Sequence, residues 1–260
     1  MNTQNLNPIS FKYFSSIALV GFSMLTSTTP AMAQTHAKPV SSTKRVRSPA
    51  QTYGMNEAAG SISYRNLHAR ELLGKHYRKS IVSRSAQVSD VSEFVHQRTE
   101  MRLKPRWKKQ ARLIAQTILN ESEKYGFDPV FLMAVIENES SFKPETIGTF
   151  GEIGLMQILP DTGQWIARKF NIPYSGPQSL KNPVTNIILG SAYLSYLREK
   201  FDFHSQLYLA AYNMGSRNVS RALARQVMPR EYPTRVMKRY VRFYTELHEN
   251  PQAPLTVALD

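Results

Sequence analysis

The chain has 260 residues, no cysteine and a formal net charge of +14 at pH 7. The absence of cysteine excludes a disulfide framework and a thiolate metal site, so the fold must depend on its apolar core. The excess of Lys and Arg favours attraction to polyanions, but no nucleic-acid-binding motif accompanies it, and nucleic acid is not an expected partner. The six histidines lack H-x-x-x-H and H-E-x-x-H spacings. We therefore expect no metal and no other cofactor.

Residues 1–33 show the features of a secretory signal peptide in the usual order. Lys12 precedes the mostly apolar run Tyr13–Leu25, and Ala31-Met32-Ala33 forms a small-x-small cleavage site. The alternative is a membrane anchor, but the run is short for a bilayer core of about 30 Å. We expect cleavage after Ala33, a periplasmic location and no stable transmembrane segment in the mature protein.

Residues 34–100 are predicted to form a basic N-terminal segment that is largely disordered or partly helical. Residues 34–60 are rich in Ser, Thr, Pro, Lys and Arg. From Ser61 to Arg98 apolar residues alternate with charges without a clear period, so short helices are plausible there. This segment is a candidate tether to a partner or to anionic polymers.

Residues 101–250 are predicted to form one mainly α domain, followed by a C-terminal tail at 251–260. Gly126 ends a first amphipathic helix, and Asp128-Pro129 and Asn182-Pro183 each supply an N-cap followed by proline at the first helical position. Later helices are expected at 183–201, 207–212, 219–227 and 234–247. No alternating run of strand length is present, although a small β-hairpin within Phe142–Ile158 is compatible with the pattern.

The stretch Ile136–Thr162 contains the candidate chemistry. An apolar run, Phe131–Ile136, should lie in the core, and Glu137 and Glu139 follow it directly. Desolvation beside a core favours the neutral form of a carboxyl group, which is what a general acid requires near neutral pH. Glu137, two residues from Glu139, should point to another side of the helix, as a solvent-facing or supporting group.

Three motifs follow in order. E-S-x-F-x-P is matched by Glu139, Ser140, Phe142 and Pro144, G-x-x-G-L-M-Q-x-x-P-x-T by residues 151–162, and A-Y-N-x-G by residues 211–215. In these motifs residues 112–248 resemble the soluble lytic transglycosylase family, which cleaves the glycan strands of peptidoglycan and is related in fold to goose-type lysozyme. The resemblance implies a lysozyme-like, all-helical catalytic domain, with the hairpin beside its active site.

The resemblance also implies roles for individual residues. Glu139 would be the catalytic acid, and substrate contacts would come from Ser140, Met156, Gln157, Tyr212, Asn213 and Tyr240. The sequence departs from the family pattern at two positions. The serine expected nine residues after the acid is Gly148, and the glutamate of a C-terminal E-T-x-x-Y motif is Val236, which Glu231 could replace only if the loop folds back.

The expected function is that of an exported peptidoglycan lytic transglycosylase. Glu139 would protonate the bond between N-acetylmuramic acid and N-acetylglucosamine, and then accept a proton as the muramyl C6 hydroxyl closes on C1 to give a 1,6-anhydromuramyl end. One alternative is a lysozyme-like hydrolase, with Glu152 or Asp161 positioning water; another is a non-catalytic peptidoglycan-binding module. The expected partner is the glycan strand, and a secretion, conjugation or appendage complex is a candidate.

Overall fold

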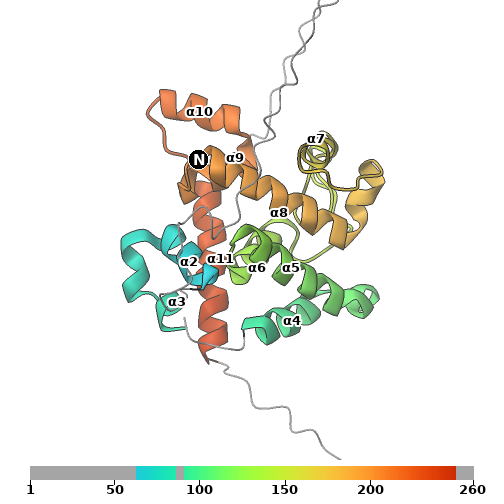
Figure 1. Cartoon of the computed structure of the whole chain (residues 1–260), viewed down its shortest axis with the longest axis horizontal. Helices are drawn as coiled ribbons and strands as arrows, with labels where there is room; N and C mark the ends of the chain where they lie inside the picture. Colours follow the sequence, from blue (N-terminus) through green and yellow to red (C-terminus); the bar gives the residue numbers. More distant parts are fainter. Residues whose placement is uncertain (1–62, 86–90, 250–260) are drawn as a thin grey trace, which may run out of the picture.

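The computed structural model of the protein describes residues 63–85 and 91–249, and these ranges contain helices but no named strand (Figure 1). The elements in the first part are α2 (Tyr64–Leu73), η1 (Gly74–Lys79), α3 (Ile81–Arg84), α4 (Val91–Arg102) and η2 (Pro105–Gln110). Those in the second part are α5 (Ala111–Tyr125), α6 (Pro129–Ser140), α7 (Pro160–Phe170), η3 (Pro177–Lys181), α8 (Pro183–Lys200), α9 (Ser205–Met214), α10 (Ser216–Ala224) and α11 (Glu231–Glu249). The predicted mainly α class is confirmed. The predicted signal peptide and C-terminal tail lie outside the described residues.

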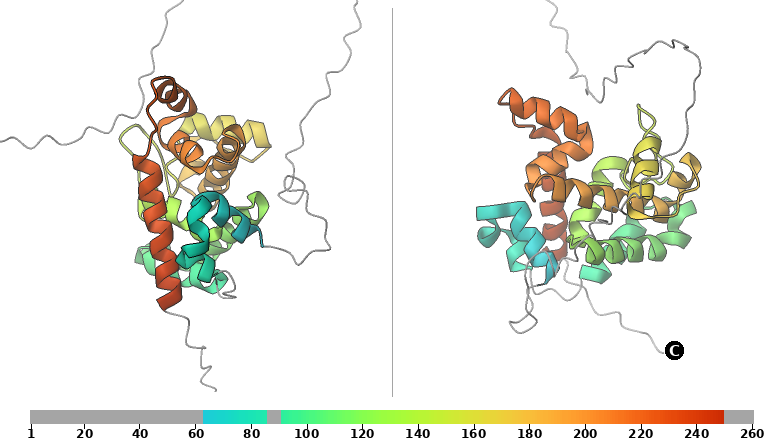
Figure 2. Two further views of the ribbon diagram at one scale, coloured as in Figure 1. Left: turned by 90° about the vertical axis from the view of Figure 1, so that its left-hand side faces the viewer. Right: turned by 45° about the horizontal axis from the view of Figure 1, so that its top comes forward.

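Helix α6 lies in the centre of the core. Its N-cap is Asp128, whose side chain accepts a hydrogen bond from the backbone N–H of Val130 at 2.9 Å, and Pro129 occupies the first helical position, as predicted. Every side chain from Phe131 to Ile136 is fully buried. A helix that is apolar on all sides must be surrounded by other elements. Here α4, α5 and α11 pack against it, and α11 runs along the side of the molecule (Figure 2).

The predicted hairpin is reduced to two isolated antiparallel bridges, Ile147 with Ile153 and Ile153 with Ile158. The turn between them requires glycine at position 154, where φ is +84° and a Cβ atom would lie 2.6 Å from the carbonyl oxygen of Leu180. The Asn186 side chain of α8 fixes the same turn, because it donates to the carbonyl oxygen of Ile153 at 2.8 Å. The loop after α6 is thereby held against α8.

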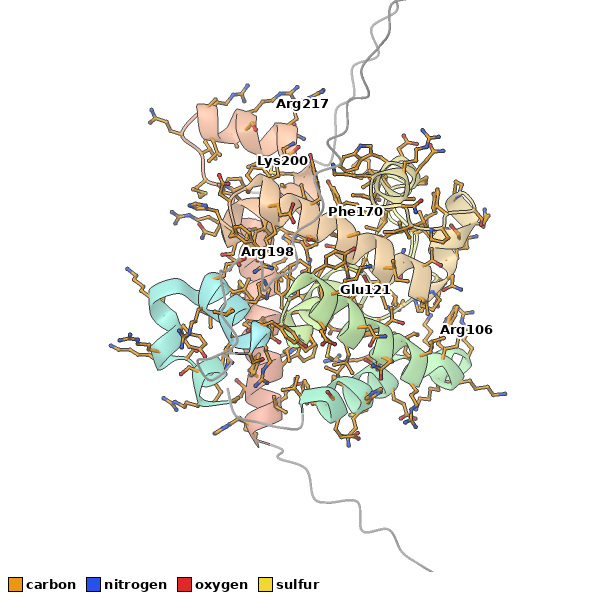
Figure 3. The ribbon with its side chains drawn as sticks, in the orientation of Figure 1. Arg106, Glu121, Phe170, Arg198, Lys200 and Arg217 are labelled. Atoms are coloured by element: carbon orange, nitrogen blue, oxygen red, sulfur yellow. The ribbon has the colours of Figure 1, made fainter. Side chains whose placement is uncertain are left out.

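The start of this loop is fixed to η2 by Glu145. Its carboxylate accepts hydrogen bonds from Lys104 Nζ at 2.8 Å and Trp107 Nε1 at 2.9 Å, and it also pairs with Arg106, which Figure 3 shows at the edge of the molecule. Burial alone would raise the pKa of Glu145, but the hydrogen bonds from Lys104, the backbone, Arg106 and Trp107 outweigh it and lower the pKa to about 2.

The packed unit begins well before residue 101, where the sequence suggested that the catalytic domain starts. Helices α2 to α4 contribute buried side chains to the common core, among them Ala69, Val82, Phe94 and Val95. Residues 63–85 and 91–100 are therefore part of the folded domain, and the predicted boundary is too late. Within the described ranges, no helix is both long and apolar enough to cross a membrane.

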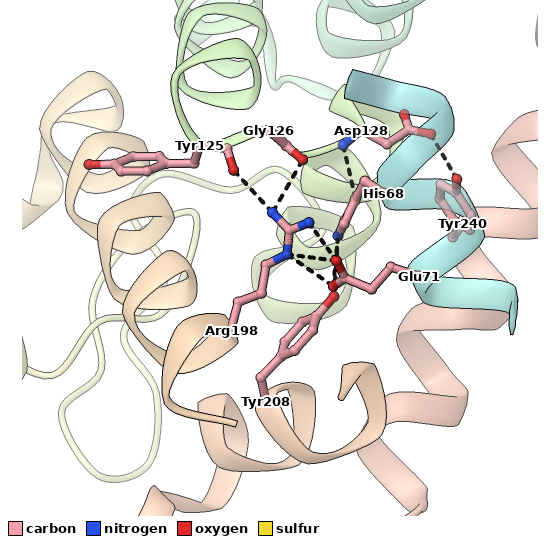
Figure 4. A network of polar contacts seen from close by, with 8 residues as sticks. All are labelled: His68, Glu71, Tyr125, Gly126, Asp128, Arg198, Tyr208 and Tyr240. Atoms are coloured by element: carbon pink, nitrogen blue, oxygen red, sulfur yellow. Dashed lines mark hydrogen bonds and ion pairs between the residues drawn. The ribbon is translucent and has the colours of Figure 1, made fainter. Parts of the chain in front are cut away.

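A buried polar network attaches α2 to the core (Figure 4). His68 is fully buried and its Nδ1 accepts a hydrogen bond from the backbone N–H of Asp128 at 3.0 Å, which places the ring proton on Nε2, 3.2 Å from the Tyr208 hydroxyl. Burial first, and the charge of Arg198 second, hold the pKa of His68 well below its usual value, so the ring is neutral. Asp128 Oδ2 in turn accepts hydrogen bonds from Tyr240 and Tyr244, each at 2.7 Å.

An ion pair completes the network. Arg198 of α8 binds Glu71 of α2 through Nε at 2.9 Å and Nη2 at 2.5 Å, and Arg198 Nη1 donates to the carbonyl oxygens of Tyr125 and Gly126 at 3.1 and 3.3 Å. The side chains of Arg198 and Glu71 are only 5% and 10% exposed. A buried guanidinium with this many acceptors is well compensated for its lost hydration. The pair joins two helices that are distant in sequence.

Candidate active site

Glu139 lies in the last turn of α6, where the buried helix reaches the surface. Its carboxylate opens into a cavity of about 460 Å³, which is lined by Asn138, Glu139, Gly148, Thr149, Phe150, Glu152, Gln157, Asn213, Tyr232 and Arg235. A smaller space of about 30 Å³ adjoins it and is lined by Glu139, Glu152, Gln157, Ile158, Leu159, Thr162, Tyr193, Tyr212 and Asn213. The helix thus delivers a carboxylate from an apolar core to a solvent-accessible cavity.

Tyr232 is the direct partner of Glu139. Its hydroxyl donates a hydrogen bond to Glu139 Oε1 at 2.5 Å, and its side chain is 4% exposed. Burial first, and the charge of Glu139 second, raise the pKa of Tyr232 well above its usual value. Tyr232 is therefore a neutral hydrogen-bond donor at physiological pH.

The family resemblance implied a substrate contact at Tyr240 instead, and this prediction is wrong. Tyr240 is fully buried and its hydroxyl is bonded to Asp128, near the opposite end of α6 from Glu139. Helix α11 begins at Glu231, whereas the sequence-based expectation was a start at residue 234. An earlier start would have placed Tyr232 in the first turn of this helix and made it a candidate for the site.

Two further predicted substrate contacts are structural instead. Ser140 is 6% exposed, and its hydroxyl donates to the carbonyl oxygen of Leu155 at 2.9 Å. Met156 is fully buried against Gly190, where a Cβ atom would lie 2.5 Å from the Met156 sulfur. Neither residue lines the cavities, contrary to the predictions. Both instead hold the loop after α6 against the end of that helix and against α8.

Gln157, Tyr212 and Asn213 do line the cavities beside Glu139. The Tyr212 ring stacks on that of Tyr232, with centroids 6.5 Å apart and planes at 26°, and its hydroxyl donates to the carbonyl oxygen of Met156 at 2.8 Å. The structure brings these three side chains to the acid, and their contact with substrate stays a prediction.

Glu152 is a second carboxylate in the site. It is 4% exposed, lines both cavities and accepts a hydrogen bond from the backbone N–H of Phe150 at 3.0 Å. Its position also accounts for Gly148, because a Cβ atom there would lie 2.4 Å from Glu152 Oε2 and 2.7 Å from Gln157 Oε1. A serine at position 148, as in the family pattern, would require the Glu152 and Gln157 side chains to shift.

The other candidate carboxylates, Asp161, Glu231 and Glu137, do not line the cavities. Asp161 is exposed in the first turn of α7, and Glu231 is exposed and pairs with Arg235. Glu137 is buried, not solvent-facing, and its Oε1 lies 3.2 Å from Arg102 Nη1 and 3.3 Å from Arg242 Nη2. Glu137 therefore supports the end of α6 by linking it to α4 and α11. Among the residues that the structure describes, no three His, Asp or Glu side chains are grouped to hold a metal ion.

Several known proteins are similar to part of this chain. Residues 116–232 match the family model of the transglycosylase SLT domain. The putative soluble lytic murein transglycosylase of Haemophilus influenzae is 39% identical over 103 residues, which are 40% of this chain and 17% of that protein. The soluble lytic murein transglycosylase of Escherichia coli K12 is 40% identical over 86 residues, which are 33% of this chain and 13% of that protein. This chain thus matches less than a fifth of the length of either relative.

A more extended match is the membrane-bound lytic murein transglycosylase C of Histophilus somni, 33% identical over 147 residues, which are 50% of this chain and 39% of that protein. Among solved structures, an inactive mutant of lytic transglycosylase Slt from Pseudomonas aeruginosa is 25% identical with a TM-score of 0.47, over 71% of this chain and 30% of that one. The matched range contains Glu139 and all three sequence motifs. Residues 116–232 of this chain are thus similar to the SLT domain of lytic transglycosylases.

Proposed function

We propose that this protein is an exported lytic transglycosylase that cleaves the β-1,4 bond between N-acetylmuramic acid and N-acetylglucosamine in peptidoglycan. One observation carries the proposal: helix α6, fully buried from Phe131 to Ile136, presents Glu139 in its last turn. The Glu139 carboxylate opens into a cavity of about 460 Å³ and accepts a hydrogen bond from the Tyr232 hydroxyl. A carboxyl group at the boundary between core and cavity is suited to exchange a proton with a bound substrate.

The proposed reaction needs only one carboxylate. Ordinary glycosidases use two, because a second carboxylate must act as nucleophile or activate water. Here the muramyl C6 hydroxyl is the nucleophile. Glu139 gives its proton to the glycosidic oxygen as the bond to C1 breaks, and then takes the proton of the C6 hydroxyl as its oxygen bonds to C1. The product is a 1,6-anhydromuramyl end, and no water is consumed.

Tyr232 and the two aromatic rings of Tyr212 and Tyr193 assist this reaction. A hydroxyl that donates to Glu139 stabilises the carboxylate that remains after the proton has left, and Tyr232 can do so because it stays neutral. Tyr212 and Tyr193, whose ring centroids are 5.4 Å apart, line the smaller space beside the acid. Aromatic rings present flat apolar surfaces that suit the faces of pyranose sugars.

Lysozyme-like hydrolysis is the second candidate, and the position of Glu152 favours it. Glu152 lines both cavities together with Glu139, as a residue that activates water would. Mass spectrometry of digested peptidoglycan separates the two reactions. Anhydro ends with wild type and with Glu152→Gln support transglycosylation, whereas hydrated reducing ends that require Glu152 support hydrolysis.

A non-catalytic glycan-binding module is the remaining alternative, and a turnover assay on purified sacculi tests it. Release of soluble muropeptides excludes the module, while retention of folded protein on sacculi without release would favour it. The Glu139–Tyr232 pair speaks against a pure binder, because a binder has no need for a carboxyl group at the end of a buried helix.

We also propose a periplasmic location and a tethering role for the basic residues 34–62, toward anionic polymers or a secretion, conjugation or appendage complex. Because residues 63–85 and 91–102 belong to the folded unit, the deletion that tests this role must stop at residue 62. If the shortened protein keeps its cellular location and its salt-dependent binding to sacculi, the tether proposal is wrong.

A further inference from the structure

Arg235 is the one cationic side chain among the described residues that line the two cavities. The other charged groups there are the carboxylates of Glu139 and Glu152. A cation in the wall of an otherwise acidic cavity favours a ligand that carries a negative charge at that wall and neutral groups elsewhere.

The side chain of Arg235 is held next to the acid. Its Cζ atom lies 5.8 Å from the centroid of the Tyr232 ring, and the hydroxyl of that ring is bonded to Glu139. Stacking on an aromatic ring restricts a guanidinium while leaving its N–H groups free to bind an anion. An anion bound by Arg235 would therefore lie close to the bond that Glu139 protonates.

The present partner of Arg235 is easily replaced. Nη1 of Arg235 lies 2.5 Å from Glu231 Oε1, but the Glu231 side chain is 90% exposed and the Arg235 side chain 43%. Exposed ion pairs of this kind are weak because water solvates both charges. A ligand carboxylate within the cavity could take the place of Glu231 and bind the guanidinium through two parallel hydrogen bonds.

We infer that Arg235 binds a carboxylate carried by the muramyl sugar; this inference rests on the proposed function. In a peptidoglycan strand every second sugar is muramyl, and only that sugar bears a carboxylate, either on its lactyl ether or on the peptide attached to it. Recognition of that carboxylate fixes the register of the strand. It places the muramyl sugar, rather than N-acetylglucosamine, on the side of the cavity where its C1 is attacked.

The test measures the affinity of the folded protein for three saccharides of equal length by calorimetry. They are peptide-bearing glycan strands, amidase-treated strands with free lactyl carboxylates, and chito-oligosaccharides, which have no carboxylate. The variants are Arg235→Gln and Arg235→Lys, and the control is Lys238→Gln, which removes a charge from the same helix at an exposed position that lines neither cavity.

Arg235→Gln should weaken binding of a carboxylate-bearing strand about tenfold, the effect of one charge-assisted hydrogen bond, and leave binding of chito-oligosaccharides unchanged. The affinity of Arg235→Lys for these strands should lie between those of wild type and Arg235→Gln, because lysine keeps the charge but not the paired donors. If Arg235→Gln loses affinity only for the amidase-treated strands, Arg235 binds the lactyl carboxylate. If it loses affinity only for the peptide-bearing strands, Arg235 binds a carboxylate of the peptide.

The inference would be overturned if Arg235→Gln lost affinity equally for all three saccharides, or if Lys238→Gln lost as much affinity as Arg235→Gln. It would also be overturned if Arg235→Gln bound both kinds of strand as tightly as wild type. These outcomes leave the proposed function standing if wild type still releases anhydromuropeptides. A wild-type protein that binds none of the saccharides would instead overturn both.

Discussion

Tyr232 donates a hydrogen bond to Glu139 over 2.5 Å, although the two residues are 93 positions apart in the sequence. Glu139 lies in the last turn of α6 and Tyr232 in the first turn of α11, so the contact forms only when these two helices pack correctly. At the opposite end of α6, its N-cap Asp128 accepts hydrogen bonds from the hydroxyls of Tyr240 and Tyr244 of α11. The acid and its partner are thereby positioned by the same pair of helices.

Replacement of Tyr232 by Phe should lower kcat about tenfold to a hundredfold, which corresponds to one hydrogen bond to a charged group. The ring remains, so its stacking on Tyr212 should persist. Muropeptide release from sacculi measures the effect, and circular dichroism melting checks the fold. Tyr240→Phe serves as the control, because it removes a hydroxyl from the same helix away from the acid and should change stability rather than kcat. Equal kcat for wild type and Tyr232→Phe would show that the hydroxyl has no part in the reaction.

Replacement of Gly148 by Ser restores the residue of the family pattern but should lower activity. The new Cβ would lie 2.4 Å from Glu152 Oε2, so the loop or the carboxylate must move. Shortening the second side chain in a Gly148→Ser, Glu152→Ala double variant should recover part of the loss if Glu152 is not itself catalytic. A double-mutant cycle on muropeptide release measures the coupling. Full activity of the single Gly148→Ser variant would contradict the crowding that the structure shows.

Replacement of Arg198 by Ala should reduce the free energy of unfolding by about 3–5 kcal/mol, because it leaves the buried Glu71 carboxylate without its cation. Urea denaturation measures this change. Arg242→Ala is a suitable comparison: this side chain is 46% exposed, and its loss should cost much less. Similar costs for the two variants would mean that the α2–α8 ion pair does not hold the N-terminal helices on the domain.

Glu145 should make stability depend on acidity. Its pKa in the folded protein, about 2, lies below the usual value of 4.5, so the folded state favours the ionised form. This contribution is complete above pH 4.5 and is lost as pH falls toward 2. Because the carboxylate is partly exposed, the effect should be modest. Urea titrations across this pH range should show a shallower slope for Glu145→Gln than for wild type; identical slopes would exclude Glu145 as a source of the acid sensitivity.

The parts of the site that local sequence determines could be predicted. The Asp128 N-cap, the apolar run to Ile136 and the glycine-rich loop all act over a few residues, so their pattern located Glu139 at the end of a buried helix. Tyr232 was missed because its role depends on where α11 begins. Tyr240, eight residues later, matched the tyrosine of the E-T-x-x-Y motif and was chosen instead, but its hydroxyl binds Asp128.

Short N-terminal helices were expected, but their packing on the domain escaped prediction for a different reason. Helix α2 buries Ala69 and Leu72 in the core and is also held by buried polar groups: His68 contacts Asp128, and Glu71 pairs with Arg198, 127 positions away. Such pairings leave no periodic signal in the sequence. They exist only because the tertiary fold brings each partner into position.

The most direct test of the proposed function is the product that Glu139 forms. Wild type and Glu139→Gln are incubated with purified peptidoglycan, and the released muropeptides are analysed by mass spectrometry. Wild type should give 1,6-anhydromuramyl ends. Glu139→Gln, which keeps an acceptor for the Tyr232 hydroxyl but cannot donate a proton from a carboxyl group, should fold with a similar Tm and release essentially none. Anhydro products formed at a comparable rate by Glu139→Gln would contradict the assignment of Glu139 as the acid, and hydrated ends from wild type would contradict the transglycosylase reaction itself.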